Sequence, residues 1–309
     1  MTGARVMVVL LCVCAAPLWA QRTHVLIISG LGGEPAYSAT FASQARALHA
    51  VAKERWQVPD SSLVWLAEDV GVDPARVRAR ATKEEVERAI TGLAGRATAG
   101  DLVMVVLIGH GSGEGAASRV NLPGADPTAA DYALWLSAFG QQNVLFVNTA
   151  SASGDFATVL ARPGRVIMTA TRTALERNET TFATHFLTGL TGDAADANKD
   201  GRLTALEVFA FAKAEVARAY EADRKLLTER AQLSDTALAA TLVLGGGSAG
   251  ADPRVAALLS ERRALEQEVA ALRARRDAMR SEDYERELER LLLAIAEKTR
   301  AIRAAGGRP

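Results

Sequence analysis

Residues 102–113, LVMVVLIGHGSG, decide the fold of this chain. Seven apolar side chains follow one another without a polar interruption, and a Gly-rich turn with one histidine comes directly after them. Such a run is typical of a strand buried on both faces, because a strand with one solvated face alternates apolar and polar residues. Residues 143–154, NVLFVNTASASG, repeat the arrangement with a small-residue turn. The two runs predict a mostly parallel sheet.

The segments around these two runs alternate between strand and helix patterns. Further strands are predicted at residues 23–30, 63–68 and 165–171, and helices at 38–56, 82–94, 131–139, 182–190 and 206–219. The first of these helices places Phe41 and Leu48 on its buried face. The predicted fold class is therefore α/β, with a mostly parallel sheet sandwiched by helices.

The sequence predicts a main domain at residues 21–244, a Gly-rich linker at 245–252 and a helical hairpin at 253–305. In the last segment, apolar residues recur every seven positions in two series, at 258, 265, 272 and 279 and then at 288, 295 and 302. The second series is out of phase with the first, whereas a single coiled-coil seam keeps its phase. We therefore expect two antiparallel helices of coiled-coil type. They would pack on each other, on the main domain or on another copy, so the hairpin is a candidate surface for self-association.

Residues 1–20 have the layout of a secretory signal peptide, with Arg5 followed by an apolar run. A cleavage site with small residues follows, which predicts cleavage near Ala20. A membrane span needs about 20 apolar residues, and neither this run nor any later stretch is long enough. We expect a secreted or periplasmic protein with no membrane span after signal removal. Both cysteines, Cys12 and Cys14, lie in this leader. The mature chain would thus have no disulfide, thiolate metal site or cysteine nucleophile.

The charge balance argues against one class of partner. Lys and Arg together number 36, as do Asp and Glu, so the formal net charge is zero. Domains that bind nucleic acid usually carry an excess of basic residues, so we expect no nucleic-acid partner. The hydrophobic fraction of 49% is enough for a large buried core.

Two polar side chains stand in the turns after the two buried strands. His110 follows the strand in residues 102–108, and Ser151 follows the strand in residues 144–147. The carboxyl ends of parallel strands meet at one edge of a sheet, and open α/β sheets place their sites there. We therefore expect His110 and Ser151 at the same edge.

With these residues the chain resembles the caspase and legumain clan of cysteine peptidases, and more closely its bacterial legumain-like branch. His110-Gly111 is similar to the clan's catalytic His-Gly pair, and residues 150–154, ASASG, are similar to its nucleophile turn, with Ser151 standing where the clan has Cys. The resemblance extends over residues 23–235. It implies a caspase-like fold, a catalytic His110, a degenerate nucleophile Ser151, and an oxyanion hole formed by the amides of Gly111 and Ser151.

The exchange of sulfur for oxygen has a chemical consequence. In this clan the histidine is understood to stand apart from the nucleophile, which a thiol tolerates because its pKa is about 8.5. A serine hydroxyl needs a base within hydrogen-bond reach. We therefore expect a pseudopeptidase that binds a peptide or protein segment, or a scaffold. The alternative is an active serine-type endopeptidase with Ser151 or Ser153 as nucleophile and His110 as base. Glu114 or Asp155 would then orient His110.

Residues 196–207, DANKDGRLTALE, match the twelve-residue calcium loop. Gly201 would make its sharp turn, and helices are predicted on both sides. The candidate ligands of Ca²⁺ are Asp196, Asn198, Asp200, Arg202 through its carbonyl, Thr204 and Glu207. A single loop favours a structural role over sensing. The alternative is a tight connector between two helices that binds no metal.

Overall fold

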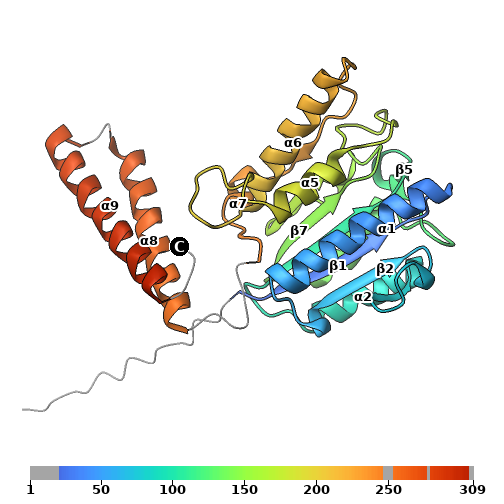
Figure 1. Ribbon diagram of the computed structural model, residues 1–309, viewed down its shortest axis with the longest axis horizontal. Coiled ribbons are helices and arrows are strands. Elements are labelled where there is room, and N and C mark those ends of the chain that lie inside the picture. Colours follow the sequence, from blue (N-terminus) through green and yellow to red (C-terminus); the bar gives the residue numbers. More distant parts are fainter. Residues whose placement is uncertain (1–20, 246–252, 277–278, 306–309) are drawn as a thin grey trace, which may run out of the picture.

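The computed structural model describes residues 21–245, 253–276 and 279–305 (Figure 1). Seven strands form one sheet in the order β3-β2-β1-β4-β7-β8-β9. Neighbouring strands are parallel except β8 and β9, which are antiparallel. The strands are β1 (Thr23–Ser29), β2 (Leu63–Ala67), β3 (Val77–Arg80), β4 (Leu102–Ile108), β7 (Asn143–Asn148), β8 (Arg165–Thr169) and β9 (Gln232–Leu233). The structure confirms the predicted α/β fold class.

Strand β4 lies near the middle of the sheet and contributes to a core on each face. Met104 and Val106 belong to one hydrophobic core, and Val103 and Val105 belong to the other. All four are fully buried or nearly so. Burying a side chain of this size contributes about 1.5–3 kcal/mol. An uninterrupted apolar strand therefore requires a helical layer on both sides.

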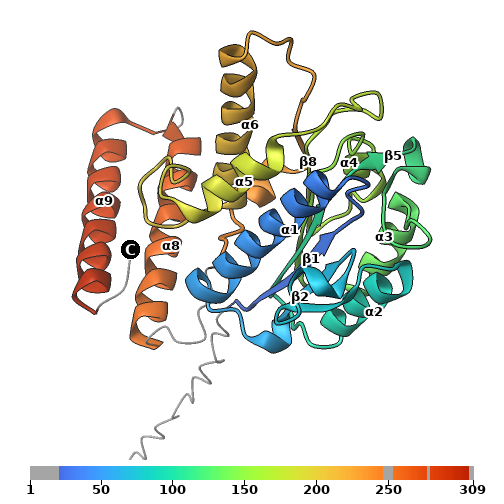
Figure 2. The same ribbon diagram turned by 45° about the vertical axis from the view of Figure 1, so that its right-hand side comes forward.

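Helices cover the sheet on both faces (Figure 2). One face carries α1 (Pro35–Ala50), α5 (Phe182–Thr191) and α6 (Ala205–Ala222), and the other carries α2 (Lys83–Ala94), α3 (Ala129–Trp135) and α4 (Phe156–Val159). The short helix α7 (Thr236–Ala239) follows β9. A separate antiparallel pair, β5 (Gly111–Ser112) and β6 (Arg119–Val120), lies directly after β4 in the chain.

Two helix starts are fixed by carboxylates. Thr204 and Glu207 form a reciprocal capping box at α6, in which Thr204 Oγ1 donates to Glu207 Oε2 at 2.7 Å and accepts from the Glu207 amide at 3.2 Å. The start of α5 is capped from a distance in sequence, because Glu229 accepts from the amides of Thr181 and Phe182 at 2.9 and 2.8 Å. Burial raises the pKa of the Glu229 carboxyl.

Several boundaries differ from the predicted ones. The helix expected at residues 38–56 begins at Pro35, which suits a first turn because proline lacks an N–H, and its last turn, Val51–Arg55, is a π helix. The helix expected at 131–139 begins at Ala129. Strands β3 and β9 were not predicted, because they are too short to show a periodic pattern.

The C-terminal helices α8 (Pro253–Ala274) and α9 (Ser281–Ala304) lie side by side as a hairpin (Figure 1). Its own core, with Val269, Leu272 and Leu291, is separate from the two cores of the sheet. In both views the hairpin lies at the end of the sheet where β1 begins, away from β5. The predicted leader and linker residues 246–252 fall outside the described residues. Within the described part of the chain, no helix is both long and apolar enough to cross a membrane.

Candidate functional site

His110 and Ser151 lie at the same edge of the sheet, in the loops that follow the adjacent strands β4 and β7. The hydroxyl oxygen of Ser151 lies 3.4 Å from the amide nitrogen of Gly111 and 3.5 Å from its carbonyl oxygen. The side chain of Ser151 is buried and His110 is partly exposed. The arrangement expected from the strand ends is therefore present, with Gly111 as the point of contact.

At position 111, glycine is the one residue type that fits this contact without movement of the backbone. A Cβ atom at this position would lie 2.2 Å from the carbonyl oxygen of Ser151 and 3.2 Å from the Cβ of Ala150. Contacts of this length to backbone atoms are far inside the van der Waals limit, so any larger residue would push the two loops apart. The glycine therefore fixes the distance between the two parts of the site.

The imidazole of His110 packs against two aromatic rings of α1. Its centroid lies 4.7 Å from that of Tyr37 and 5.0 Å from that of Phe41, both in edge-on geometry. Tyr37 in turn donates from its hydroxyl to Glu179 at 3.2 Å, and the charge of this carboxylate raises the pKa of Tyr37. None of the hydrogen bonds among the described residues involves the His110 imidazole.

The turn after β7 is held by polar contacts on both sides. Asn148 accepts from the amide of Ala150 at 3.0 Å, and the Thr171 hydroxyl accepts from the amide of Ser153 at 2.8 Å. Ala152 adopts a positive φ of 50°, which L-residues other than glycine rarely adopt. The amide of Ser151 takes part in no hydrogen bond among the described residues. It remains as a backbone donor beside the Gly111 amide.

The other candidates for the serine-type alternative are placed as follows. Ser153 is buried, and its hydroxyl lies 3.2 Å from that of Thr171. Asp155 accepts from the amide of Gly115 at 2.5 Å and from the hydroxyl of Ser118 at 3.4 Å, so its carboxylate holds the loop after β5. Glu114 is exposed. The described residues contain no hydrogen bond between either carboxylate and His110.

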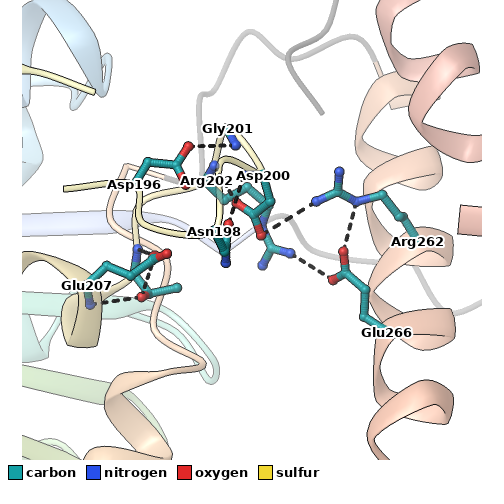
Figure 3. A network of polar contacts seen from close by, with 9 residues as sticks. Asp196, Asn198, Asp200, Gly201, Arg202, Glu207, Arg262 and Glu266 are labelled. Atoms are coloured by element: carbon teal, nitrogen blue, oxygen red, sulfur yellow. Dashed lines mark hydrogen bonds and ion pairs between the residues drawn. The ribbon is translucent and has the colours of Figure 1, made fainter. Parts of the chain in front are cut away.

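The loop at residues 196–207 connects α5 and α6, and its side-chain oxygens turn toward its own backbone (Figure 3). Asp196 accepts from the amides of Asp200 and Gly201 at 3.2 and 2.8 Å. Asn198 accepts from the amide of Asp200 at 2.8 Å, and Asp200 accepts from the amide of Arg202 at 2.8 Å. These bonds fix the turn of the loop.

In this arrangement the acidic side chains of the loop are not gathered as calcium ligands. Ca²⁺ takes six to eight oxygen ligands that converge on one point. Glu207, the expected bidentate ligand, is engaged in the capping box of α6, and among the described residues no three acidic or histidine side chains are placed to hold a metal. Calcium binding at Asp196, Asn198, Asp200, Arg202, Thr204 and Glu207 stays a prediction.

Sequence reasoning missed the residues that surround His110. Tyr37 and Phe41 are four positions apart, a spacing that puts both on one helix face, so the pattern contained part of this information. Only the packing of α1 across β4 shows that this face meets His110. Thr171, which holds the turn after β7, carried no distinctive sequence signal.

Comparisons with known proteins give the following. No family model and no curated protein sequence matches the chain. Among solved structures, caspase-1 from Spodoptera frugiperda is similar, with a TM-score of 0.48 and 12% identity, covering 76% of this chain and 93% of that chain. Protein GSU0716 from Geobacter sulfurreducens is similar with a TM-score of 0.43 and 11% identity, covering 69% of this chain and 92% of that chain. At these values neither likeness informs the chemistry of this chain.

Proposed function

We propose that this protein binds an extended peptide or protein segment at the edge formed by His110 and Ser151, and does not cleave it. The observation that carries the proposal is the position of the Ser151 hydroxyl. It lies against the backbone of Gly111 at 3.4 and 3.5 Å and has no hydrogen bond to a side-chain base among the described residues. A serine nucleophile needs such a base at about 2.6–3.2 Å.

Backbone donors supply the means of binding. The amides of Gly111 and Ser151 belong to adjoining loops, and the Gly111 amide makes a long contact of 3.4 Å with the Ser151 hydroxyl. Amides of this kind donate hydrogen bonds to a peptide carbonyl oxygen, and they keep this ability when the nucleophile is not activated. An extended peptide would add its own backbone donors and acceptors along the edge.

The packing of His110 supports a binding role over base catalysis. Tyr37 and Phe41 meet the imidazole edge-on and hold its orientation through ring contacts. Of the two carboxylates considered for orienting it, Asp155 is engaged by Gly115 and Ser118, and Glu114 is exposed. An imidazole held in this way offers a partly exposed ring to a bound peptide.

The proposed setting is outside the cytoplasm. Its support is the leader pattern of residues 1–20, which predicts secretion or delivery to the periplasm. Self-association through the hairpin is supported by the exposed Leu292 and Leu293 on α9, at 47% and 59% exposure. Sedimentation of the wild type and of a Leu292→Lys, Leu293→Lys variant tests it, and equal masses at all concentrations would contradict it.

A library of fluorescently labelled extended peptides tests the proposed function. The wild type is expected to bind part of the library saturably, measured by anisotropy, without producing new amino termini. Ser151→Cys is expected to gain cleavage, since a thiol ionises with less assistance than a hydroxyl. Ser153→Cys is the matched control and is expected to gain none, because that side chain faces Thr171 rather than the Gly111 amide. Absence of saturable binding by the wild type would overturn the proposal.

A further inference from the structure

The loop at residues 196–207 has one carboxylate oxygen that does not serve its own backbone. Asp200 Oδ1 accepts from the amide of Arg202, whereas Asp200 Oδ2 faces the C-terminal hairpin (Figure 3). Both oxygens of Asp196 are taken by amides of the loop. The outward face of the loop therefore presents negative charge at Asp200.

Arg262 of α8 points its guanidinium at this face. Its Nη2 atom lies 3.8 Å from Asp200 Oδ2, and its Nε atom lies 3.1 Å from Glu266 Oε1. The side chain is only 4% exposed, and neither Nε nor Nη2 reaches hydrogen-bond geometry with a partner in the part of the chain that the structure describes. A buried guanidinium of this kind is costly unless opposite charge surrounds it. Asp200 and Glu266 supply that charge.

A second ion pair runs in the opposite sense. Arg202, which follows Asp200 by two positions in the loop, donates to Glu266 Oε2 at 3.3 Å. Each partner thus contributes one acid and one base, Asp200 and Arg202 from the loop and Arg262 and Glu266 from α8 (Figure 3). Alternation of charge across a contact fixes its register and excludes wrongly placed partners.

The contact described here is polar. The core of the hairpin is separate from both cores of the sheet. We propose that the loop at residues 196–207 is a docking seat for the C-terminal hairpin, in which the guanidinium of Arg262 supplies the positive charge that a calcium ion would supply in a loop of this sequence. The seat and a metal ion would compete for Asp200, so docking of the hairpin and metal binding exclude each other.

This seat lies at the end of the sheet away from β5 and hence away from the edge formed by His110 and Ser151 (Figures 1 and 2). The hairpin is therefore fixed to the main domain without covering that edge. The inference does not depend on the proposed peptide binding, because no residue of the seat belongs to that edge.

Hydrogen exchange and small-angle scattering of the full chain test the seat. Arg262→Ala is expected to speed amide exchange in residues 196–204 by about tenfold or more, and to increase the radius of gyration as the hairpin swings away. Asp200→Asn, which keeps the acceptor for the Arg202 amide, is expected to act in the same direction. The double variant should add little to either, since both remove one interaction. Arg273→Ala, on the exposed surface of α8, is the matched control and should change neither quantity.

Calcium chloride at about 1 mM gives the second arm of the test, a concentration at the weak end of such loops. The wild type is expected to show no change in exchange of the loop or in its radius of gyration. Protection of the loop by calcium together with release of the hairpin would also support mutual exclusion. Protection of the loop with the hairpin still docked would overturn the proposal, as would equal behaviour of Arg262→Ala and Arg273→Ala.

Discussion

The hydroxyl oxygen of Ser151 and the amide nitrogen of Gly111 lie 3.4 Å apart, so the loops after β4 and β7 meet through the backbone of Gly111. The neighbouring His110 takes no part in this contact, since its ring packs on Tyr37 and Phe41. Among the described residues, the Ser151 hydroxyl has no hydrogen bond to a side-chain base. This geometry supports the proposed binding without cleavage.

Gly111→Ala is expected to lower the free energy of unfolding by about 1–3 kcal/mol, because the new Cβ would lie 2.2 Å from the Ser151 carbonyl oxygen. Urea unfolding followed by circular dichroism measures it. Gly140→Ala is the control, since nothing lies within 4 Å of a Cβ there, and its effect should stay within about 0.5 kcal/mol. Equal stability of the two variants would refute the close approach.

Ala152→Gly is expected to stabilise the protein by roughly 0.5–1 kcal/mol. The φ of 50° costs alanine about 1–2 kcal/mol, and the greater freedom of glycine in the unfolded chain offsets only part of the relief. Ala214→Gly, on the exposed side of α6, is the control of opposite sign. It should lower the free energy of unfolding by about 1 kcal/mol. Destabilisation by Ala152→Gly would contradict the observed backbone conformation.

Glu229→Ala is expected to lower the free energy of unfolding by about 2–4 kcal/mol, since the amides of Thr181 and Phe182 would lose their acceptor at the start of α5. Thermal unfolding measures the loss. Glu221→Ala, an exposed residue of α6, should change stability by less than about 0.5 kcal/mol. If both variants melted alike, Glu229 would not be the cap of α5.

Acidification is expected to destabilise the protein through its buried histidine, His24. Burial lowers the pKa of His24, although the contact with Asp101 opposes this, and nearby Arg96 and Arg22 lower it further. Between this lowered value and the unfolded value of about 6.5, the unfolded chain binds more protons, so stability falls as pH drops below about 6.5.

Denaturant unfolding at pH values of about 7.5, 6.5 and 5.5 measures this loss. His24→Gln removes the titrating group and keeps an amide that can donate to Asp101, so its stability should fall less over the same interval. His49 and His185 also have pKa values lowered by burial and continue to contribute. A pH dependence that His24→Gln leaves unchanged would rule out the role given to His24.

Local sequence patterns predicted most of the fold. The apolar run of β4 predicted its burial on both faces, and the strand ends placed His110 and Ser151 at one edge. The two-residue strand β9 pairs with β8 through only a short contact, and its antiparallel direction depends on where the chain returns after α6. The periodicity of the sequence does not predict the direction in which the chain re-enters the sheet.

The surroundings of the site could not be predicted for a similar reason. Asp155 carries a carboxylate in a plausible sequence position for the serine-type alternative. In the fold this carboxylate accepts from the amide of Gly115, through a contact between two loops. Arg262 lies 62 positions after Asp200, and nothing in either local sequence indicates that they meet. Long-range contacts of this kind are set by packing rather than by periodicity.

The proposed lack of cleavage is tested by comparing the initial rates of peptide-bond hydrolysis by the wild type and by Ser151→Ala. Both would be presented with the same mixture of unfolded polypeptides, and new amino termini would be counted by mass spectrometry. Because no base among the described residues activates the hydroxyl, we expect neither protein to hydrolyse peptide bonds faster than buffer alone. Hydrolysis by the wild type that disappears in Ser151→Ala would contradict the account and establish a serine-type hydrolase.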